Sequence, residues 1–409
     1  MNVKNLNVLS NIESIYKYRT SIKSAKKHDK FVNEVRNKVQ QEAIEALEKN
    51  DSNKCIVAMA TGSGKSKVAI DYAKKHSKNT SLVVPTAKLR DDNWKKEFEK
   101  WGEDYAKVTK LCYASATKYT GKKYDLCILD EGHNLTENNQ SFLLNNSIDK
   151  TLLLTATVPR KKDNYEKHEL LQDLGFSIAF ELTLDDCIKL GFVAPYTINI
   201  VEVPLESNKK TVKAGSKKKP FMTTERANYN YLSKTVMKAM YAKKGAKFMI
   251  MNRMRFIYNL QSKQEATKYI LDNFVSDEER TLIFASSIKR AEELCKDSYH
   301  SKSGSDAYNA FKGEKINKLS CVKSLDEGEN FNAVDTAVIQ QLTSKEKNLV
   351  QRLGRIIRYR PGHKGKIWIV VATDTQDEKW LKKATENLDS SNIYYYNYKN
   401  MDNYEELKD

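Results

Sequence analysis

The sequence lacks the clustered cysteines and histidines that a structural metal site needs. Its six cysteines are scattered, and no CxxC pair or Cys/His cluster occurs. Several of them lie inside apolar runs, where a thiol behaves as a small buried hydrophobic group in a reducing compartment. We therefore expect reduced, buried cysteines and no zinc site.

Long apolar runs are absent as well. A membrane-spanning helix needs about 18 or more consecutive apolar residues, and no such run is present. The first residues, MNVKNLNVLSNIES, also lack the apolar core of a signal peptide. The sequence therefore predicts a cytoplasmic protein with no membrane partner.

Acidic residues are too few to balance the basic ones. The 409 residues contain 70 Lys and Arg against 53 Asp and Glu, which gives a net charge of +17. Such a charge favours polyanionic partners, nucleic acid first among them, although solubility alone would also explain it.

Short apolar runs alternate with polar helical segments along the first half of the chain. Most of these runs are continuously apolar, which is typical of parallel strands covered by helices on both faces. This pattern predicts a doubly wound α/β unit over residues 31–204, preceded by a polar extension over 1–30. The strands predicted for this unit are 55–60, 81–85, 126–130, 151–157 and 196–204.

A second α/β unit is predicted after a stretch rich in Lys, Ser and Gly. Residues 205–229 lack apolar periodicity and read as a linker or basic insertion. A helix over 252–274 and strands over 281–286, 337–342 and 367–373 then indicate a second unit at 230–380. The tyrosine-rich tail, 381–409, is open to two readings, a docked segment or partial disorder.

A phosphate-binding loop is predicted where the first strand meets a helix. The segment MATGSGKSKVAI (59–70) contains GKS, but Met59 stands where the strict P-loop pattern has its first glycine. The strand–loop–helix context therefore carries the prediction. Backbone N–H groups would wrap the phosphates, the lysine would reach the β- and γ-phosphates, and the serine hydroxyl would hold Mg²⁺. The residues concerned are Thr61, Gly62, Ser63, Gly64, Lys65 and Ser66.

Two further segments carry chemistry. The apolar strand at 126–130 ends in Asp130 and Glu131, of which the first could hold Mg²⁺ and the second could deprotonate a water. Near the C-terminus, QRLGRIIRYR (351–360) spaces three arginines by three residues, so they would share one side of a helix. Such a face is either a solvated surface or a grip on phosphates.

In order along the chain, MATGSGKS, DEGH, TAT and QRLGRIIR resemble motifs I, II, III and VI of superfamily 2 helicases. Four more segments resemble motifs Q, Ia, IV and V of that superfamily, and they read VQQEAI, VVPTAKLRDDNWKKEF, TLIFASSIKRAEEL and VKSLDEGENFNAVDTAVI. The box reads DEGH and not DEAD, which points away from DEAD-box RNA helicases. Motifs V and VI most resemble the branch with XPB-like and phage UvsW-like DNA helicases, so a phage gene in a bacterial host is one origin left open.

This resemblance implies two tandem RecA-like doubly wound parallel-sheet domains with an ATP cleft between them, and ATP and Mg²⁺ as cofactors. Lys65 would bind phosphate, Ser66 and Asp130 the metal, and Glu131 would be the catalytic base. By motif, the resemblance also implies that Gln40 contacts adenine and that Gly328 lies on the nucleotide side of motif V. His133, Thr155 and Thr157 would couple the nucleotide site to nucleic acid. Gln351, Arg355 and Arg358 would complete the ATP site.

Nucleic acid would be held through its backbone across both domains. The candidate contacts, again by resemblance, are Pro85, Thr86, Lys88, Ser115, Ser286, Lys323 and Ser324. The implied function is a monomeric, ATP-dependent 3′–5′ DNA helicase or translocase acting on single-stranded or branched DNA such as forks, junctions or R-loops. Two alternatives stay open: an RNA helicase or transcript-release ATPase, and a clamp that binds nucleic acid without turnover.

Overall fold

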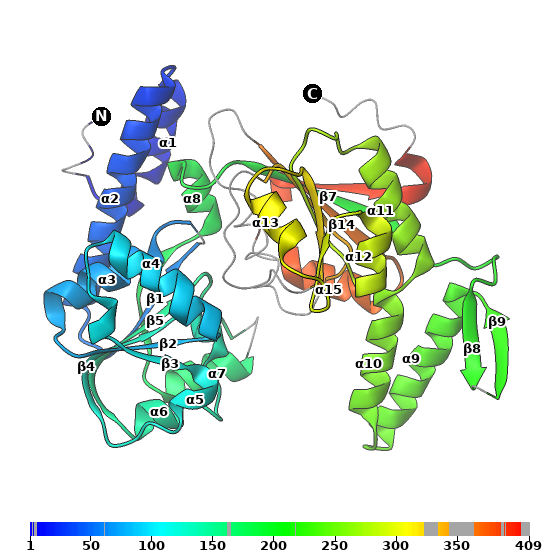
Figure 1. The fold of residues 1–409 in the computed structure, drawn as a ribbon, viewed down its shortest axis with the longest axis horizontal. Helices are drawn as coiled ribbons and strands as arrows, with labels where there is room; N and C mark the ends of the chain where they lie inside the picture. Colours follow the sequence, from blue (N-terminus) through cyan, green and yellow to red (C-terminus); the bar gives the residue numbers. More distant parts are fainter. Residues whose placement is uncertain are drawn as a thin grey trace. The chain divides into compact units, whose positions relative to one another are not determined.

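The structure is a computed structural model, and it describes residues 1, 3, 6–60, 62–161, 165–216, 218–322, 334–342, 364–385, 388 and 390–401. The chain divides into two compact units, residues 1–194 and 195–409. Each unit is an α/β layer structure (Figure 1). No helix of the described residues is long and apolar enough to cross a membrane.

The first unit is built on a parallel sheet. Its described residues form six strands in the order β3-β2-β4-β5-β1-β6, and each strand pairs in parallel with its neighbours. The central strands are buried along most of their length because helices cover the sheet. In sheet order the strands are Thr109–Cys112, Thr80–Val84, Lys123–Leu129, Ser147–Thr155, Lys54–Met59 and Ser177–Leu182.

Five of the described helices of this unit lie between strands of its sheet, two precede β1 and one follows β6. Their length follows the polar segments between the apolar runs, and α8 begins at a capping box formed by Thr183 and Asp186. The helices are α1 Ile12–Ser21, α2 Ala25–Lys49, α3 Lys65–His76, α4 Lys95–Lys100, α5 Tyr113–Ala116, α6 Ser141–Leu144, α7 Tyr165–Asp173 and α8 Leu184–Leu190. Single-turn segments are η2 Leu9–Asn11, η3 Leu89–Trp94, η4 Tyr105–Lys107 and η5 Gly132–Asn134.

The N-terminal segment is part of the first unit and not a separate extension. Helix α2 starts at Ala25, six residues before the predicted start of the domain. Ile15 of α1 is fully buried, and the Arg19 side chain donates to the carbonyl oxygens of Lys189 and Ile188 at 3.0 and 3.3 Å. Helix α1 has too few apolar positions for a core of its own, and it packs against α8 and α2 (Figure 1).

The second unit contains a longer parallel sheet. Its described residues form seven strands in the order β11-β12-β10-β13-β14-β7-β15, all paired in parallel. In sheet order the strands are Ser298–Tyr299, Lys318–Cys321, Thr281–Phe284, Thr336–Ile339, Gly365–Ala372, Tyr196–Val203 and Ile393–Asn397.

The predicted domain boundary at residue 204 is therefore wrong. Strand β7 pairs with β14 over its whole length, from Tyr196 with Gly365 to Val203 with Ala372. It belongs to the second sheet, and the boundary lies between residues 194 and 195. The tail of the chain also contributes: β15 pairs with β7, so this part of the tail is docked in the sheet.

The predicted linker is largely structured. Residues 205–229 contribute most of an antiparallel hairpin, β8 Val212–Ser216 with β9 Lys219–Thr223, and the start of helix α9, Glu225–Tyr241. The predicted helix over 252–274 is two helices, α10 and α11, which break at Asn259. The remaining helices are α10 Ala246–Tyr258, α11 Gln261–Asn273, α12 Ile288–Leu294, α13 Asp306–Lys312, α15 Gln376–Thr385 and the single turn η6 Ser390–Asn392.

Candidate nucleotide site and nucleic-acid interface

The predicted site segments of the first unit gather at one edge of its sheet. Because its strands are parallel, the loops after β1, β2, β4 and β5 all leave the carboxyl edge. The phosphate loop follows β1, and the Pro85–Lys88 segment follows β2. The Asp130–Glu131 pair follows β4, and the Thr155–Thr157 segment lies at the end of β5. The sheet topology therefore places four sequence-distant segments at the edge where α/β proteins bind ligands.

The phosphate loop has the backbone of an anion cradle. Gly62 and Gly64 have φ values of +88° and +102°, a region that favours glycine. Gly64 caps the N-terminus of α3, so Lys65 and Ser66 begin the helix. Lys65 Nζ donates to Met59 O at 2.7 Å, which holds the ammonium group over the end of β1. N–H groups at a helix start, beside a lysine, favour a phosphate.

Gln40 lies directly against this loop. It is 4% exposed, and its Nε2 donates to Ser63 O at 3.2 Å. A Cβ atom on Gly64 would meet the Gln40 amide, and the φ of +102° is strained for a residue with a side chain, so this position favours glycine. The buried Gln40 Oε1 has no hydrogen-bond partner within the part of the chain that the structure describes. This buried acceptor can receive a hydrogen bond from the N–H group of a ligand.

Asp130 is held from two sides at the end of β4. Its Oδ2 accepts from Trp94 Nε1 at 2.7 Å, and its Oδ1 accepts from the backbone N–H of Glu131 at 2.9 Å. Burial, followed by the charge of Glu131, raises the pKa of Asp130 to about 6, whereas Trp94 and Lys65 act in the opposite direction.

Trp94 is a site residue that we did not predict. It is buried and ends the π-helical turn η3, a type of turn that is frequent at functional sites. The resemblance to motif Ia included this residue in its sequence string, but the contact to Asp130 depends on tertiary structure. Tyr113, also not predicted, donates from its hydroxyl to Asp130 O at 3.0 Å.

The turn after Asp130 is tight. Glu131 has φ +49° and ψ +57°, which is unusual for a residue with a side chain. A Cβ atom at Gly132 would lie 2.1 Å from Leu153 Cδ2 on strand β5. The glycine of DEGH is thus required by the close approach of β5. This turn fixes the direction in which the Glu131 carboxylate leaves the sheet.

The predicted coupling residues lie around this turn. His133 Nδ1 lies 3.4 Å from Glu131 Oε2. Thr155, at the end of β5, is buried, and its hydroxyl donates to Thr157 O at 2.9 Å. His133 therefore contacts the acidic pair, whereas Thr155 contacts Thr157.

The predicted nucleic-acid contacts of the first unit lie beside the same edge. Pro85 is partly exposed, and Thr86 and Lys88 are exposed, in the loop between β2 and η3. The Thr86 hydroxyl accepts from Leu89 N at 3.3 Å. Ser115 lies in α5, and its hydroxyl donates to Cys112 O at 3.1 Å. Pro85, Thr86 and Lys88, three of the four candidate contacts in this unit, are thus at least partly exposed to solvent after β2.

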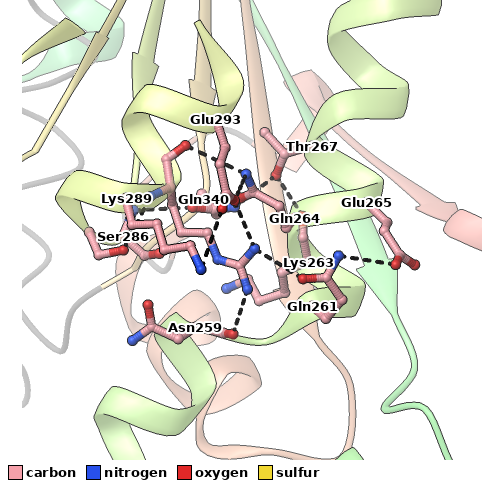
Figure 2. Close-up of polar contacts among 12 residues, drawn as sticks. Asn259, Gln261, Lys263, Gln264, Glu265, Thr267, Ser286, Lys289, Glu293 and Gln340 are labelled. Atoms are coloured by element: carbon pink, nitrogen blue, oxygen red, sulfur yellow. Dashed lines mark hydrogen bonds and ion pairs between the residues drawn. The ribbon is translucent and has the colours of Figure 1, made fainter. Parts of the chain in front are cut away.

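In the second unit, Ser286 follows β10 and is held by a buried amide network (Figure 2). The Ser286 N–H donates to Gln340 Oε1 at 3.1 Å. Gln340 Nε2 donates to Gln264 Oε1 at 2.6 Å and lies 3.4 Å from Thr267 Oγ1. Gln264 Nε2 in turn donates to Glu293 Oε2 at 3.2 Å. One glutamine side chain, Gln340, which we did not predict, therefore connects the loop after β10 to helix α11.

A buried ion pair lies on the same helix, α11. Lys263 Nζ and Asp377 Oδ2 are 2.6 Å apart, and both side chains are 0% exposed. The Ala372 N–H donates to the same carboxylate oxygen at 3.1 Å. This pair fastens α11 to the end of β14 and the start of α15.

Several predicted residues lie outside the described part of the chain. They include one phosphate-loop residue and the residues of motifs V and VI, and they are Thr61, Lys323, Ser324, Gly328, Gln351, Arg355 and Arg358. The three-residue spacing of arginines in QRLGRIIRYR likewise stays a prediction.

Comparison with known proteins agrees with this geometry. A family model described as "Type III restriction enzyme, res subunit" matches residues 34–120, and one described as "Helicase conserved C-terminal domain" matches residues 262–360. The DNA 3′-5′ translocase XPB2 of Sulfurisphaera tokodaii is 24% identical over 348 residues, covering 78% of this chain and 77% of that protein. This relative gives the expected phage origin no support.

Two solved structures share the fold. The Type ISP restriction-modification enzyme LlaBIII bound to DNA has a TM-score of 0.57 and 14% identity, covering 88% of this chain but 31% of that one. This chain thus spans about a third of LlaBIII. A fragment described as the HsdR subunit of a type I restriction enzyme from Vibrio vulnificus YJ016 has a TM-score of 0.55 and 15% identity, covering 89% and 68% of the two chains.

The two units are RecA-like α/β domains, and the chain is similar to superfamily 2 helicases over the two segments that the family models match. Its similarity to the XPB2 translocase of Sulfurisphaera tokodaii supports the XPB-like branch of that superfamily. It is accordingly a nucleic-acid-dependent ATPase, and helicases of this family use ATP, usually with Mg²⁺.

The side chains at the sheet edge fit such a metal. Ser66 and Asp130 offer hydroxyl and carboxylate oxygens, the hard donors that Mg²⁺ prefers. Asp130 is also oriented by two donors, as carboxylates around a metal generally are.

Proposed function

We propose that this protein is an ATP-driven DNA translocase that moves 3′–5′ and remodels branched DNA, working as a monomer. One observation carries the proposal: a lysine-bearing phosphate loop and an oriented Asp–Glu pair occupy one sheet edge. The relative named DNA 3′-5′ translocase XPB2 supports the choice of DNA and of direction.

ATP would be held by the first unit through its own groups. The N–H groups of residues 62–66 would contact the phosphates, and Lys65 would leave Met59 O to reach them. Gln40 would accept from the adenine amine with its buried Oε1. Ser66 and Asp130 would hold Mg²⁺, which when bound neutralises phosphate charge.

Glu131 would accept a proton from the attacking water. Its positive-φ turn directs the carboxylate away from the strand, and Gly132 permits that turn. Asp130 and Glu131 have different roles because Asp130 is fixed by two donors in a buried setting, whereas Glu131 lies beside His133. His133, Thr155 and Thr157 would relay the state of the nucleotide to the nucleic acid.

The second unit would complete the ATP site. Arg355 and Arg358 would stabilise charge on the γ-phosphate, with Gln351 beside them, and Gly328 would lie near the nucleotide. Arg358→Ala should then abolish hydrolysis and spare most DNA binding. An arginine that only grips DNA would show the reverse.

DNA would be held through its backbone by residues of both units. Pro85, Thr86, Lys88 and Ser115 would contact its backbone in the first unit. Ser286, Lys323 and Ser324 would do so in the second. Backbone contacts of this kind make binding tolerant of sequence and strongly dependent on salt.

ATPase stimulation by a substrate panel tests the proposal. Single-stranded DNA, a three-way fork, blunt duplex and RNA of equal length are compared with wild type, Lys65→Ala and Lys67→Ala. Lys67 is the matched control because it lies two residues along α3 and pairs with Asp71 at 2.7 Å. We expect the fork and single-stranded DNA to stimulate most, Lys65→Ala to be inactive and Lys67→Ala to resemble wild type. Stimulation by RNA alone, or no stimulation at all, would refute the proposal.

A further inference from the structure

Most of the chain's excess positive charge lies in one segment. Residues 206–258, here called the basic arm, contain 14 Lys and Arg and two Glu, a net charge of +12 out of +17 for the whole protein. One of the two acids, Glu225, is buried and accepts from the N–H groups of Ser262 and Glu206. The charged groups that the basic arm exposes to solvent are therefore almost all positive.

The basic arm has its own architecture. Helices α9 and α10 lie side by side, and the β8–β9 hairpin lies beside α9 (Figure 1). The three elements stand off the seven-stranded sheet of the second unit (Figure 1). Because the described elements of the arm cover little of the sheet, much of their surface stays open to solvent.

Exposed aromatic and cationic side chains share one side of α9. Tyr231, Lys234, Lys238 and Tyr241 are spaced by three, four and three residues, so they form one stripe. Tyr231 is 65% exposed and Tyr241 86% exposed. The buried Val236 lies on another face of the helix, so the stripe is not the core face.

Helix α10 repeats the pattern. Phe248, Met251 and Arg255 are spaced by three and four residues and are all exposed. Two more exposed lysines, Lys243 and Lys244, lie in the turn that joins α9 to α10. Both helices thus expose aromatic or apolar side chains together with cations, and their junction adds two further cations.

The chemistry of this surface favours one kind of occupant. A protein-binding surface is enriched in aromatic residues but depleted of lysine at its core. Here lysines stand between the tyrosines of a single stripe, and the surrounding charge is nearly all positive. Rings on which bases stack, with cations for the phosphates between them, are the features of single-stranded nucleic-acid binding.

We propose that the basic arm is a second nucleic-acid-binding surface, which holds the unpaired strand of a branched DNA. Bases stack on Tyr231 and Tyr241, and the intervening phosphates contact Lys234 and Lys238. The inference rests on the proposed function, because the strand is that of the DNA which the motor remodels. It goes further by giving the chain a means to select DNA with unpaired arms.

Binding without ATP tests this surface. Fluorescence anisotropy compares a fork with unpaired arms and a blunt duplex, for wild type and for Tyr231→Ala/Tyr241→Ala. We expect the fork to bind at least about fivefold more weakly to the variant, since each stacked base contributes measurably, and the duplex to bind nearly as before. Unchanged fork binding would overturn the proposal, and an equal loss for both DNAs would overturn the role of unpaired bases.

Salt dependence tests the lysines separately. Lys234→Ala/Lys238→Ala should reduce the slope of log K against log salt by about 1.4 for a single strand. The matched control is Lys26→Ala/Lys30→Ala, which removes two exposed lysines at the same spacing from α2. The control should leave the slope unchanged. An equal reduction by both pairs would mean general electrostatic attraction and would overturn the proposal.

ATPase measurements separate this inference from the proposed function. At saturating single-stranded DNA, the arm variants should keep the wild-type kcat, because none of these residues belongs to the nucleotide site. If the wild type shows no DNA-dependent hydrolysis, the motor fails while the arm's binding is still judged by anisotropy. If the arm variants lose kcat at saturation, the arm belongs to the motor track and the proposal of a second surface is wrong.

Discussion

Replacing Trp94 by Phe should slow ATP hydrolysis while leaving the fold intact. Trp94 is 2% exposed, and its indole N–H donates to Asp130 Oδ2 at 2.7 Å. Phenylalanine keeps an aromatic ring in the same buried position but cannot donate. Asp130 then keeps the bond from the Glu131 N–H to its other oxygen and loses the one that fixes its rotation.

The size of the effect follows from that bond. A hydrogen bond to a charged group contributes about 1.5–3 kcal/mol. If the whole amount is lost between ground and transition states, kcat falls by about 10- to 150-fold. The pKa of Asp130 should also rise further, because Trp94 is one of the groups that lower it. Since Trp94 contacts the acidic pair and not the phosphate loop, KM for ATP should change much less.

The assay is steady-state ATPase activity at saturating DNA, with thermal unfolding measured on the same samples. The matched control is Trp101→Phe, because Trp101 makes the same kind of bond to a carboxylate, Glu97 Oε2, at 3.1 Å away from the acidic pair. We expect this control to keep wild-type kcat. Wild-type kcat in Trp94→Phe, or an equal loss in both variants, would refute the reasoning.

Three further substitutions test other parts of the fold. Lys263→Met should lower the free energy of unfolding by about 3–5 kcal/mol, because it leaves the buried Asp377 carboxylate without its cation, and adding Asp377→Leu should recover most of this loss. A loss below about 1 kcal/mol in denaturant titration would contradict this prediction. Gly132→Ala should lower the free energy of unfolding by about 1–3 kcal/mol, because the new methyl group overlaps the Leu153 side chain. The double variant with Leu153→Ala should lose less free energy of unfolding than the sum of the two single variants, and strict additivity would disprove the overlap. Gln340→Leu should raise the DNA concentration for half-maximal ATPase by about fivefold or more, since the part-buried Ser286 N–H in the loop after β10 loses its partner. An unchanged concentration would argue against this positioning role.

Local sequence patterns predicted the core of the first unit well. The strands expected at 55–60, 81–85, 126–130 and 151–157 correspond to β1, β2, β4 and β5. Continuous apolar runs bounded by polar segments carry this information because a parallel strand is buried on both faces. The phosphate loop was predictable for the same reason, since its residues are contiguous and their context is a strand followed by a helix.

Partnerships between distant strands were not predictable in this way. The run at 196–204 is apolar enough for a strand in either sheet, and only its pairing with β14 assigns it to the second unit. The break at Asn259 was hidden too, because apolar residues continue on both sides of it. There the Asn259 side chain donates to Arg255 O at 2.8 Å and ends α10.

Supporting residues of the site were missed because their role comes from contacts in three dimensions. Trp94 is 36 residues from Asp130 in the sequence, and Gln340 is 54 residues from Ser286. For Gln340 a sign was present in the sequence, namely a glutamine inside the largely apolar run predicted as a strand over 337–342. Such a residue needs partners, and the end of a parallel strand is where a site would use them.

The central claim is that ATP hydrolysis drives this protein along DNA, and a streptavidin-displacement assay tests it most directly. Single-stranded DNA with biotin at its 5′ or its 3′ end is incubated with wild type or Glu131→Gln in the presence of ATP. A 3′–5′ translocase should strip streptavidin from the 5′ end, and Glu131→Gln should bind the DNA without displacing anything. No displacement by the wild type, or equal displacement by Glu131→Gln, would contradict the account.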